Sequence, residues 1–136
     1  MSTKEQAPWT IIDMNFFSIY VDDMQAALKF YSTVFGAPGY REGEIRGWKM
    51  GATWFTILPG SQANAPGRNP RNCEIALQVG SRSEVTNLYR ALVNAGAEAG
   101  WTPEDTEMYV PMHYGYVNDP FGVRFDVYCL LDKDGK

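Results

Sequence analysis

Hydrophobic and polar positions along the chain follow the same order of patterns twice. Residues 15–21 (NFFSIYV) are aromatic and β-branched, which is typical of a strand, and residues 24–35 then place apolar side chains on one face of a helix. After a polar stretch, residues 74–79 (EIALQV) again indicate a strand, and residues 85–95 carry a second helical stripe. The pattern therefore predicts two strand–helix units in succession.

Both predicted helices have start and stop signals. Asp22 provides an acidic N-cap with Gln25 three residues later, and the run 81–84 (SRSE) forms a capping box. Gly36 and Gly96 follow the last apolar positions, where a glycine C-cap is expected. The two helices are thus expected to end at these glycines.

Short apolar runs follow each helix. Residues 40–58, divided by three glycines, predict a three-stranded meander; the second half should hold short strands around 98–101 and 108–118, the turn Asp119–Gly122 and a last strand over 123–131. Residues 59–72 contain three prolines and two glycines, which is typical of a linker. We therefore expect one compact domain, with a first module over residues 14–59, a linker over 60–72 and a second module over 73–131.

An internal repeat relates the two halves. A shift of 58 residues aligns strand and helix without a gap: Phe16 falls on Glu74, Ile19 on Leu77, Val21 on Val79, Phe30 on Leu88, Tyr31 on Tyr89 and Val34 on Leu92. Two unrelated amphipathic units could match by chance. The strand end, the helix cap and the tyrosine coincide in one register, however, and this favours a true repeat.

Composition and charge exclude several classes of function. Twelve basic and 16 acidic residues give a formal charge of −4, so the chain is not expected to bind nucleic acid. It has no apolar run of about 18 residues and no signal-peptide core near its N-terminus, which predicts a cytoplasmic protein without a membrane partner. In that compartment Cys73 and Cys129, both in strand-like runs, are expected to be buried free thiols.

Two motifs resemble those of the vicinal oxygen chelate superfamily, which includes glyoxalase I, bleomycin-resistance proteins and extradiol dioxygenases. Residues 19–37 (IYVDDMQAALKFYSTVFGA) resemble the first-module signature of this superfamily, and residues 114–127 (YGYVNDPFGVRFDV) resemble its last hairpin. The resemblance implies an α+β fold in which two βαβββ modules form curved mixed sheets around a cleft, with the helices outside. It also implies a homodimer.

The same resemblance locates four positions that hold a divalent metal in many relatives. Here they fall on Phe16, Glu74, Asp126 and either Phe55 or Thr56. Phenylalanine cannot bind a metal, and threonine is not a normal ligand for zinc, nickel or iron. Two carboxylates without an imidazole suit these metals poorly, so no cofactor is expected. Magnesium is not excluded, because it can bind through one or two carboxylates and water.

Strand alternation predicts which side chains line the cleft. Aromatic walls with a few polar groups are the usual character of a small-molecule pocket. The expected ligand-binding residues are Phe16, Ser18, Tyr20, Trp54, Thr56, Glu74, Gln78, Asp126 and Tyr128, with His113 as a lid residue near the cleft mouth. Trp48 is expected in the core.

Three functions remain open from the sequence. The first is a metal-independent small-molecule-binding protein whose ligand presents a polar or cationic group to Glu74 and Asp126. The second is a lyase or isomerase that uses Glu74 or Asp126 as general base. The third is a protein–protein interaction module with a filled cleft, in which the two carboxylates only pair with neighbours such as Arg124.

Overall fold

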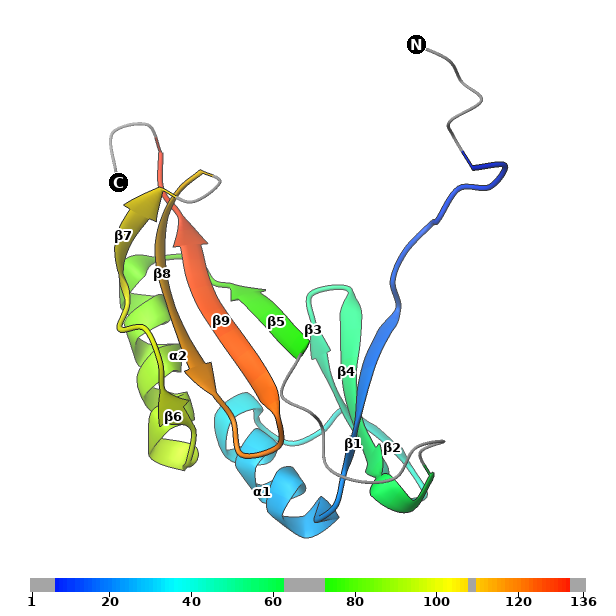
Figure 1. The fold of residues 1–136 in the computed structure, drawn as a ribbon. Coiled ribbons are helices and arrows are strands. Elements are labelled where there is room, and N and C mark those ends of the chain that lie inside the picture. The colour runs from blue at the N-terminus through cyan, green and yellow to red at the C-terminus, as the bar shows by residue number, and fades with distance from the viewer. Residues whose placement is uncertain (1–6, 63–72, 108–109, 133–136) are drawn as a thin grey trace.

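Two sheets and two helices make up the computed structural model, which describes residues 7–62, 73–107 and 110–132 (Figure 1). The first unit forms a four-stranded sheet in the order β1-β4-β3-β2. Its elements are β1 (Phe16–Val21), α1 (Met24–Phe35), β2 (Tyr40–Glu42), β3 (Ile45–Met50) and β4 (Thr53–Pro59), followed by a short 3₁₀ turn at Gly60–Gln62.

The second unit forms a five-stranded sheet in the order β5-β9-β8-β6, with β7 pairing with β8 beside β6. Its elements are β5 (Cys73–Gln78), α2 (Arg82–Ala95), β6 (Glu98–Ala99), β7 (Glu104–Glu107), β8 (Pro111–Asn118) and β9 (Val123–Leu130). The two units therefore form the expected α+β fold. Strand β7 is an addition to the predicted pattern, because its sequence EDTE has almost no apolar signal.

The two sheets repeat one topology. In each, the first strand pairs in parallel with the last, β1 with β4 and β5 with β9. Ser18 lies opposite Thr56, and Ala76, which is 58 residues after Ser18, lies opposite Asp126. Thr56 is therefore the structural counterpart of Asp126, which settles the choice left open between Phe55 and Thr56. Phe55 points to the other face and is buried in the core.

The helix caps explain where each helix begins. Asp23, one residue later than expected, caps α1 by accepting a hydrogen bond from the Ala26 amide at 3.0 Å. Ser81 caps α2 as predicted, and Glu84 completes the box by accepting from the Gly80 amide at 2.8 Å. Gly36 and Gly96 end the helices at positive φ, which glycine adopts without strain.

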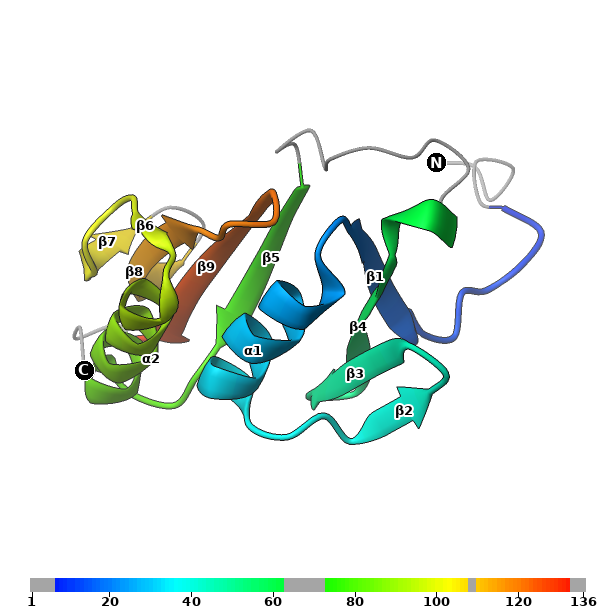
Figure 2. The same ribbon diagram turned by 90° about the horizontal axis from the view of Figure 1, so that it is seen from below.

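Helix α1 joins the two units through one hydrophobic core. Figure 2 shows α1 beside the space between the two sheets and α2 against the second sheet. The Tyr31 ring on α1 contacts Phe55 of the first sheet at 4.9 Å and Phe125 of the second at 6.2 Å between ring centroids. Trp48 is buried as predicted, and its indole donates to the Gly36 carbonyl at 2.7 Å.

The remaining expectations concern the linker, the cysteines and the membrane. Most of the expected linker, residues 63–72, lies outside the described residues. Both cysteines are free thiols as predicted; Cys129 is buried and Cys73 is half-buried. Within the described ranges, no helix is both long and apolar enough to cross a membrane.

Candidate ligand pocket

A pocket of ≈ 470 Å³ lies on the face of the second sheet that turns away from α2. Alternation along the strands produces it, because Phe125 and Val127 point into the core while their neighbours on β9 point outward. The pocket is lined by Glu74 and Ala76 of β5, Arg124, Asp126, Tyr128 and Leu130 of β9, Met112 and Tyr114 of β8, and Val110 just before β8.

A buried polar network forms the floor of the pocket. Asp126 is only 5% exposed and accepts hydrogen bonds on Oδ1 from the Tyr114 hydroxyl at 3.0 Å and from Arg124 Nε at 2.9 Å. Arg124 also donates from Nη2 to the Tyr114 hydroxyl at 2.6 Å. Each of the three side chains thus hydrogen-bonds to the other two, and these bonds compensate the cost of burying the Asp126 charge.

Glu74 extends this network toward the opening. Its Oε2 lies 3.8 Å from Arg124 Nε, and its side chain stays about half exposed. Hydrogen bonding to the Asp126 carboxyl raises the pKa of Glu74; burial and the Asp126 charge act in the same direction, while the Arg124 charge opposes them. Glu74 is therefore the member of the network that can exchange a proton or accept a polar group of a ligand.

The guanidinium group of Arg124 is positioned from two sides. Although burial acts against its charge, the hydrogen bonds to Asp126 and Tyr114 raise the pKa of Arg124 above its ordinary value. The guanidinium carbon lies 3.7 Å from the centre of the Tyr116 ring, which is a cation–π contact. That ring lies so close over Gly100 that a β-carbon there would be 2.2 Å from it. The lack of a side chain at Gly100 thus leaves room for the Tyr116 ring, against which the Arg124 guanidinium packs.

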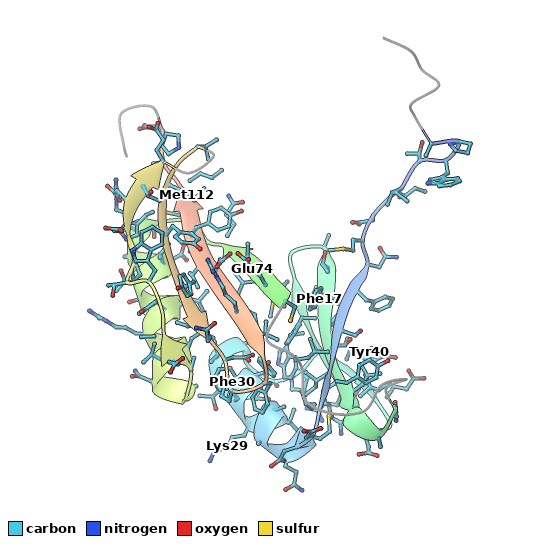
Figure 3. The ribbon with its side chains drawn as sticks, viewed as in Figure 1. Phe17, Lys29, Phe30, Tyr40, Glu74 and Met112 are labelled. Carbon is cyan, nitrogen blue, oxygen red and sulfur yellow. The ribbon has the colours of Figure 1, made fainter. Side chains whose placement is uncertain are left out.

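The far end of the pocket is apolar. Met112 is buried at the start of β8, whereas Val110 and Leu130 are 44% and 51% exposed at the rim. Figure 3 shows Met112 at that end of the sheet, and Glu74 nearer the space between the two sheets. The pocket therefore offers an apolar wall at one end and carboxylates at the other.

Only three of the predicted ligand-binding residues line this pocket: Glu74, Asp126 and Tyr128. Five others lie on the first sheet, in alternating positions of β1 and β4: Phe16, Ser18, Tyr20, Trp54 and Thr56. There Ser18 and Thr56 share a hydrogen bond of 2.5 Å, and Trp54 packs on Tyr40 with ring centroids 6.3 Å apart. Gln78 continues the alternation on β5 but lies beyond the residues that form the pocket wall.

His113 lies on the opposite side of β8 from the pocket. Its Nδ1 lies 2.6 Å from Asp105, which also pairs with Arg82 of α2 at 3.0 Å. Hydrogen bonds from Arg82 and then from His113 lower the pKa of Asp105 to about 2. The structure therefore places His113 in a contact that joins α2 to the sheet edge. His113 alternates with Met112 and Tyr114, which line the pocket, so it lies on the other face of the strand.

The residues present do not fit the divalent metal that many relatives hold. Two of the four equivalent positions, Phe16 and Thr56, lie on the other sheet, and only Glu74 and Asp126 line the pocket. The described part of the chain contains no cluster of three His, Cys, Asp or Glu side chains that could hold a metal ion. Arg124 Nε already donates to Asp126 Oδ1 at 2.9 Å, so this carboxylate is engaged and Glu74 is the pocket carboxylate left to accept a further group.

The pocket also contains residues that the sequence reading missed. They are Val110, Met112, Tyr114 and Leu130, together with Arg124, which was considered only as a partner of the carboxylates. The alternation of residues 112, 114 and 116 across the last hairpin carried this signal, because every second residue faces the same side of a sheet.

Comparisons with known proteins agree with this fold. The family model Glyoxalase/Bleomycin resistance protein/Dioxygenase superfamily matches residues 13–127. No curated protein matches the chain.

Several solved structures are similar over nearly the whole chain. A glyoxalase-related enzyme from Fulvimarina pelagi is 22% identical with a TM-score of 0.74, covering 93% of this chain and 96% of that one. A glyoxalase/bleomycin resistance protein/dioxygenase from Nocardioides is 16% identical with a TM-score of 0.73, covering 96% and 91%. A family enzyme from Burkholderia phytofirmans is 21% identical with a TM-score of 0.69, covering 88% and 99%. At these identities the likeness shows the fold.

Proposed function

Since this chain belongs to the Glyoxalase/Bleomycin resistance protein/Dioxygenase superfamily, we propose that it binds a small molecule in the Glu74–Asp126 pocket without a metal ion. The observation that carries the proposal is the network of Glu74, Asp126 and Arg124 at one end of a ≈ 470 Å³ cavity. A cavity of this size is in the usual range for a small organic ligand. Such an open cavity argues against an interaction module with a filled cleft.

The charges of the pocket favour a ligand with a cationic group. Arg124 and Asp126 neutralise each other through a direct ion pair of 2.9 Å, so the ionised Glu74 carboxylate carries the remaining charge. An ammonium or amidinium group beside Glu74 would compensate this charge. The apolar rim of Val110, Met112 and Leu130 suits a hydrocarbon or aromatic portion of the same molecule.

One observation supports a catalytic alternative. Hydrogen bonding to Asp126 raises the pKa of Glu74, and a carboxylate with a raised pKa is a better general base. A lyase or isomerase could use Glu74 in this way, with Asp126 and Arg124 holding it in place. Catalysis would require a product, whereas simple binding would not, so turnover of a bound compound separates the two functions.

The cellular setting is part of the same proposal. Free thiols at Cys73 and Cys129 suit a reducing compartment, which supports a cytoplasmic protein. We also propose a homodimer, for which the exposed apolar surface of the chain gives a specific arrangement below.

Matched ligands test the binding proposal. Benzylamine, benzyl alcohol and benzoate share one ring and differ in charge, so a thermal-shift and calorimetric comparison isolates the role of the carboxylates. The proposal expects benzylamine to bind most tightly, and Glu74→Gln to remove its advantage over benzyl alcohol. Equal or tighter binding of benzoate would contradict the proposed charge preference. A chelator should leave all three affinities unchanged.

A further inference from the structure

The segment before β1 is an extended arm with exposed apolar side chains. Within residues 7–15, called here the N-terminal arm, Trp9, Ile11, Ile12 and Met14 are 68%, 76%, 95% and 63% exposed. Figure 1 shows the arm leaving β1 and pointing away from both sheets. Four large apolar side chains in so short a segment form a patch that a soluble chain normally covers.

The arm is held at its end nearest to β1. Asn15 accepts a hydrogen bond from the Trp54 amide at 2.9 Å, and the Met14 carbonyl accepts from the Thr53 hydroxyl at 3.0 Å. Both contacts are to β4, the strand that pairs with β1, so the arm residues next to β1 continue the direction of that strand. Its outer part is thus presented in a defined direction from the first sheet.

Two sheet edges are available near this arm. In the described part of the chain, β1 pairs only with β4 and β5 pairs only with β9, so each is an edge strand. A groove of ≈ 330 Å³ separates them, and Met14 and Phe17 line it on one side while Ile75 and Leu77 line it on the other. Long apolar edges of this kind favour pairing with another chain unless they are covered.

Strand direction selects where the arm would lie on a second copy. If β1 approaches a β5 edge in the antiparallel direction, the arm reaches the end of that sheet where β5 and β9 finish and β8 begins. Val110 and Leu130, 44% and 51% exposed, lie at this end. A parallel approach would place the arm at the opposite end, near Cys73 and Val123, where the described surface has no comparable apolar group.

We infer that the N-terminal arm docks on a second copy of this chain, with Ile11 and Ile12 against the apolar rim formed by Val110 and Leu130. A twofold axis lets each copy offer its arm and receive the other, which gives a closed dimer. A stable interface of this kind needs about 800 Å² from each partner. The four arm side chains, Phe16 and the two rim residues can supply a large part of that area.

The arm then borders the pocket of its partner. Val110 and Leu130 are also pocket-lining residues, so the docked arm closes the apolar end of that pocket and leaves the carboxylate end open. The inference does not depend on the proposed ligand chemistry, because association is measured without any ligand. Failure of the arm docking and failure of the proposed ligand binding are therefore separate results.

The experiment measures association of the full chain by analytical ultracentrifugation at concentrations up to about 100 µM. The variants are Ile11→Ser with Ile12→Ser on the arm, and Leu130→Ser on the rim. Both sites are exposed, so neither change disturbs the core. Tyr40→Ser is the matched control, since Tyr40 is an exposed aromatic residue at the far edge of the first sheet. Thermal unfolding verifies that each variant is folded.

The inference expects a wild-type dimer whose dissociation constant rises about tenfold or more in the arm and rim variants and stays unchanged in the control. Combining the arm and rim changes should weaken the dimer by less than the product of their separate effects, because they remove one contact. A monomeric wild type overturns the inference. Protection of the arm from hydrogen exchange in such a monomer would show that the arm packs on its own sheet instead. A dimer unaffected by the arm variant also overturns it, and multiplicative effects overturn the pairing of arm with rim.

Discussion

The Tyr31 hydroxyl of α1 donates a hydrogen bond to the Asp119 carboxylate in the turn between β8 and β9, which joins the first module to the second. Asp119 is 1% exposed and also accepts hydrogen bonds from the amides of Phe121 and Val123 at 2.8 and 2.9 Å. Burial and then the Asp119 charge raise the pKa of Tyr31, so its hydroxyl remains a donor. The contact thus links the tyrosine of the first motif to the aspartate of the last hairpin.

Replacing Tyr31 by phenylalanine should lower the free energy of unfolding by about 1–3 kcal/mol, because a buried carboxylate oxygen loses this donor. Tyr89, the repeat counterpart on α2, is the matched control. Within the described residues its buried hydroxyl has no hydrogen-bond partner, so Tyr89→Phe should be neutral or stabilising. Urea denaturation measures both. A Tyr31→Phe variant as stable as Tyr89→Phe would contradict the role of the Asp119 contact.

Asp126→Asn should weaken benzylamine binding by about 1–3 kcal/mol, since the variant removes a buried charge that orders Arg124 and Glu74. Asparagine keeps the size of the side chain and an oxygen that can accept from Tyr114. Titration calorimetry gives the affinity, and unfolding experiments show whether the variant remains folded. Glu98→Gln, which removes an exposed carboxylate outside the pocket, serves as control and should leave the affinity unchanged. An unchanged affinity in Asp126→Asn would remove this residue from the site.

Affinity for benzylamine should increase with pH through the raised pKa of Glu74, above its ordinary value of 4.5. Below that pKa the carboxyl holds its proton and cannot compensate an ammonium group. The same shift has the opposite effect on the free energy of unfolding. Because the folded chain holds the proton more tightly than the unfolded chain, this contribution to stability is present at low pH and is lost as the pH rises through the folded pKa. Calorimetry between pH 4 and 8 measures the first effect and thermal unfolding the second. Both should disappear in Glu74→Gln; persistence of either effect there would assign it to another group.

Gly100→Ala should destabilise the fold by about 1–3 kcal/mol and weaken ligand binding, since the new β-carbon displaces the Tyr116 ring from beneath Arg124. Gly39→Ala is a suitable control because its β-carbon would lie 3.4 Å from the Trp54 ring, an ordinary contact. Chemical denaturation and benzylamine titration compare the two. The positioning role of Gly100 predicts that Tyr116→Leu lowers the affinity as well. If Gly100→Ala binds as the wild type does, the Tyr116 ring is not needed to hold Arg124.

The fold could be predicted from the sequence because each local signal agreed with the tertiary arrangement. The capping residues before α2, the glycines after both helices and the repeat of 58 residues all describe short-range structure. The turn Asp119–Gly122 could be located for the same reason. Strand β7 escaped because Glu104–Glu107 is polar and is held by long-range contacts, namely its pairing with β8 and the contact of Asp105 with Arg82 of α2.

The candidate site was only partly predictable. Alternation correctly assigned Glu74 and Asp126 to one face, because the period of a strand is local. It could not show that Phe16, Ser18 and Thr56 lie outside the pocket, since the placement of the two sheets depends on long-range packing such as that of Tyr31 against both. The partnership of Tyr114 with Asp126 was also hidden, because it depends on how far the side chains reach across neighbouring strands.

The central claim is that the Glu74–Asp126 pocket binds a cationic small molecule without a metal. Titration of benzylamine into the wild type and into Glu74→Gln, each treated with a chelator, tests it most directly. We predict saturable binding to the wild type with one site per chain, and weaker binding to the variant. Binding that appears only after zinc, nickel or iron is restored, or equal binding by both proteins, would contradict the claim.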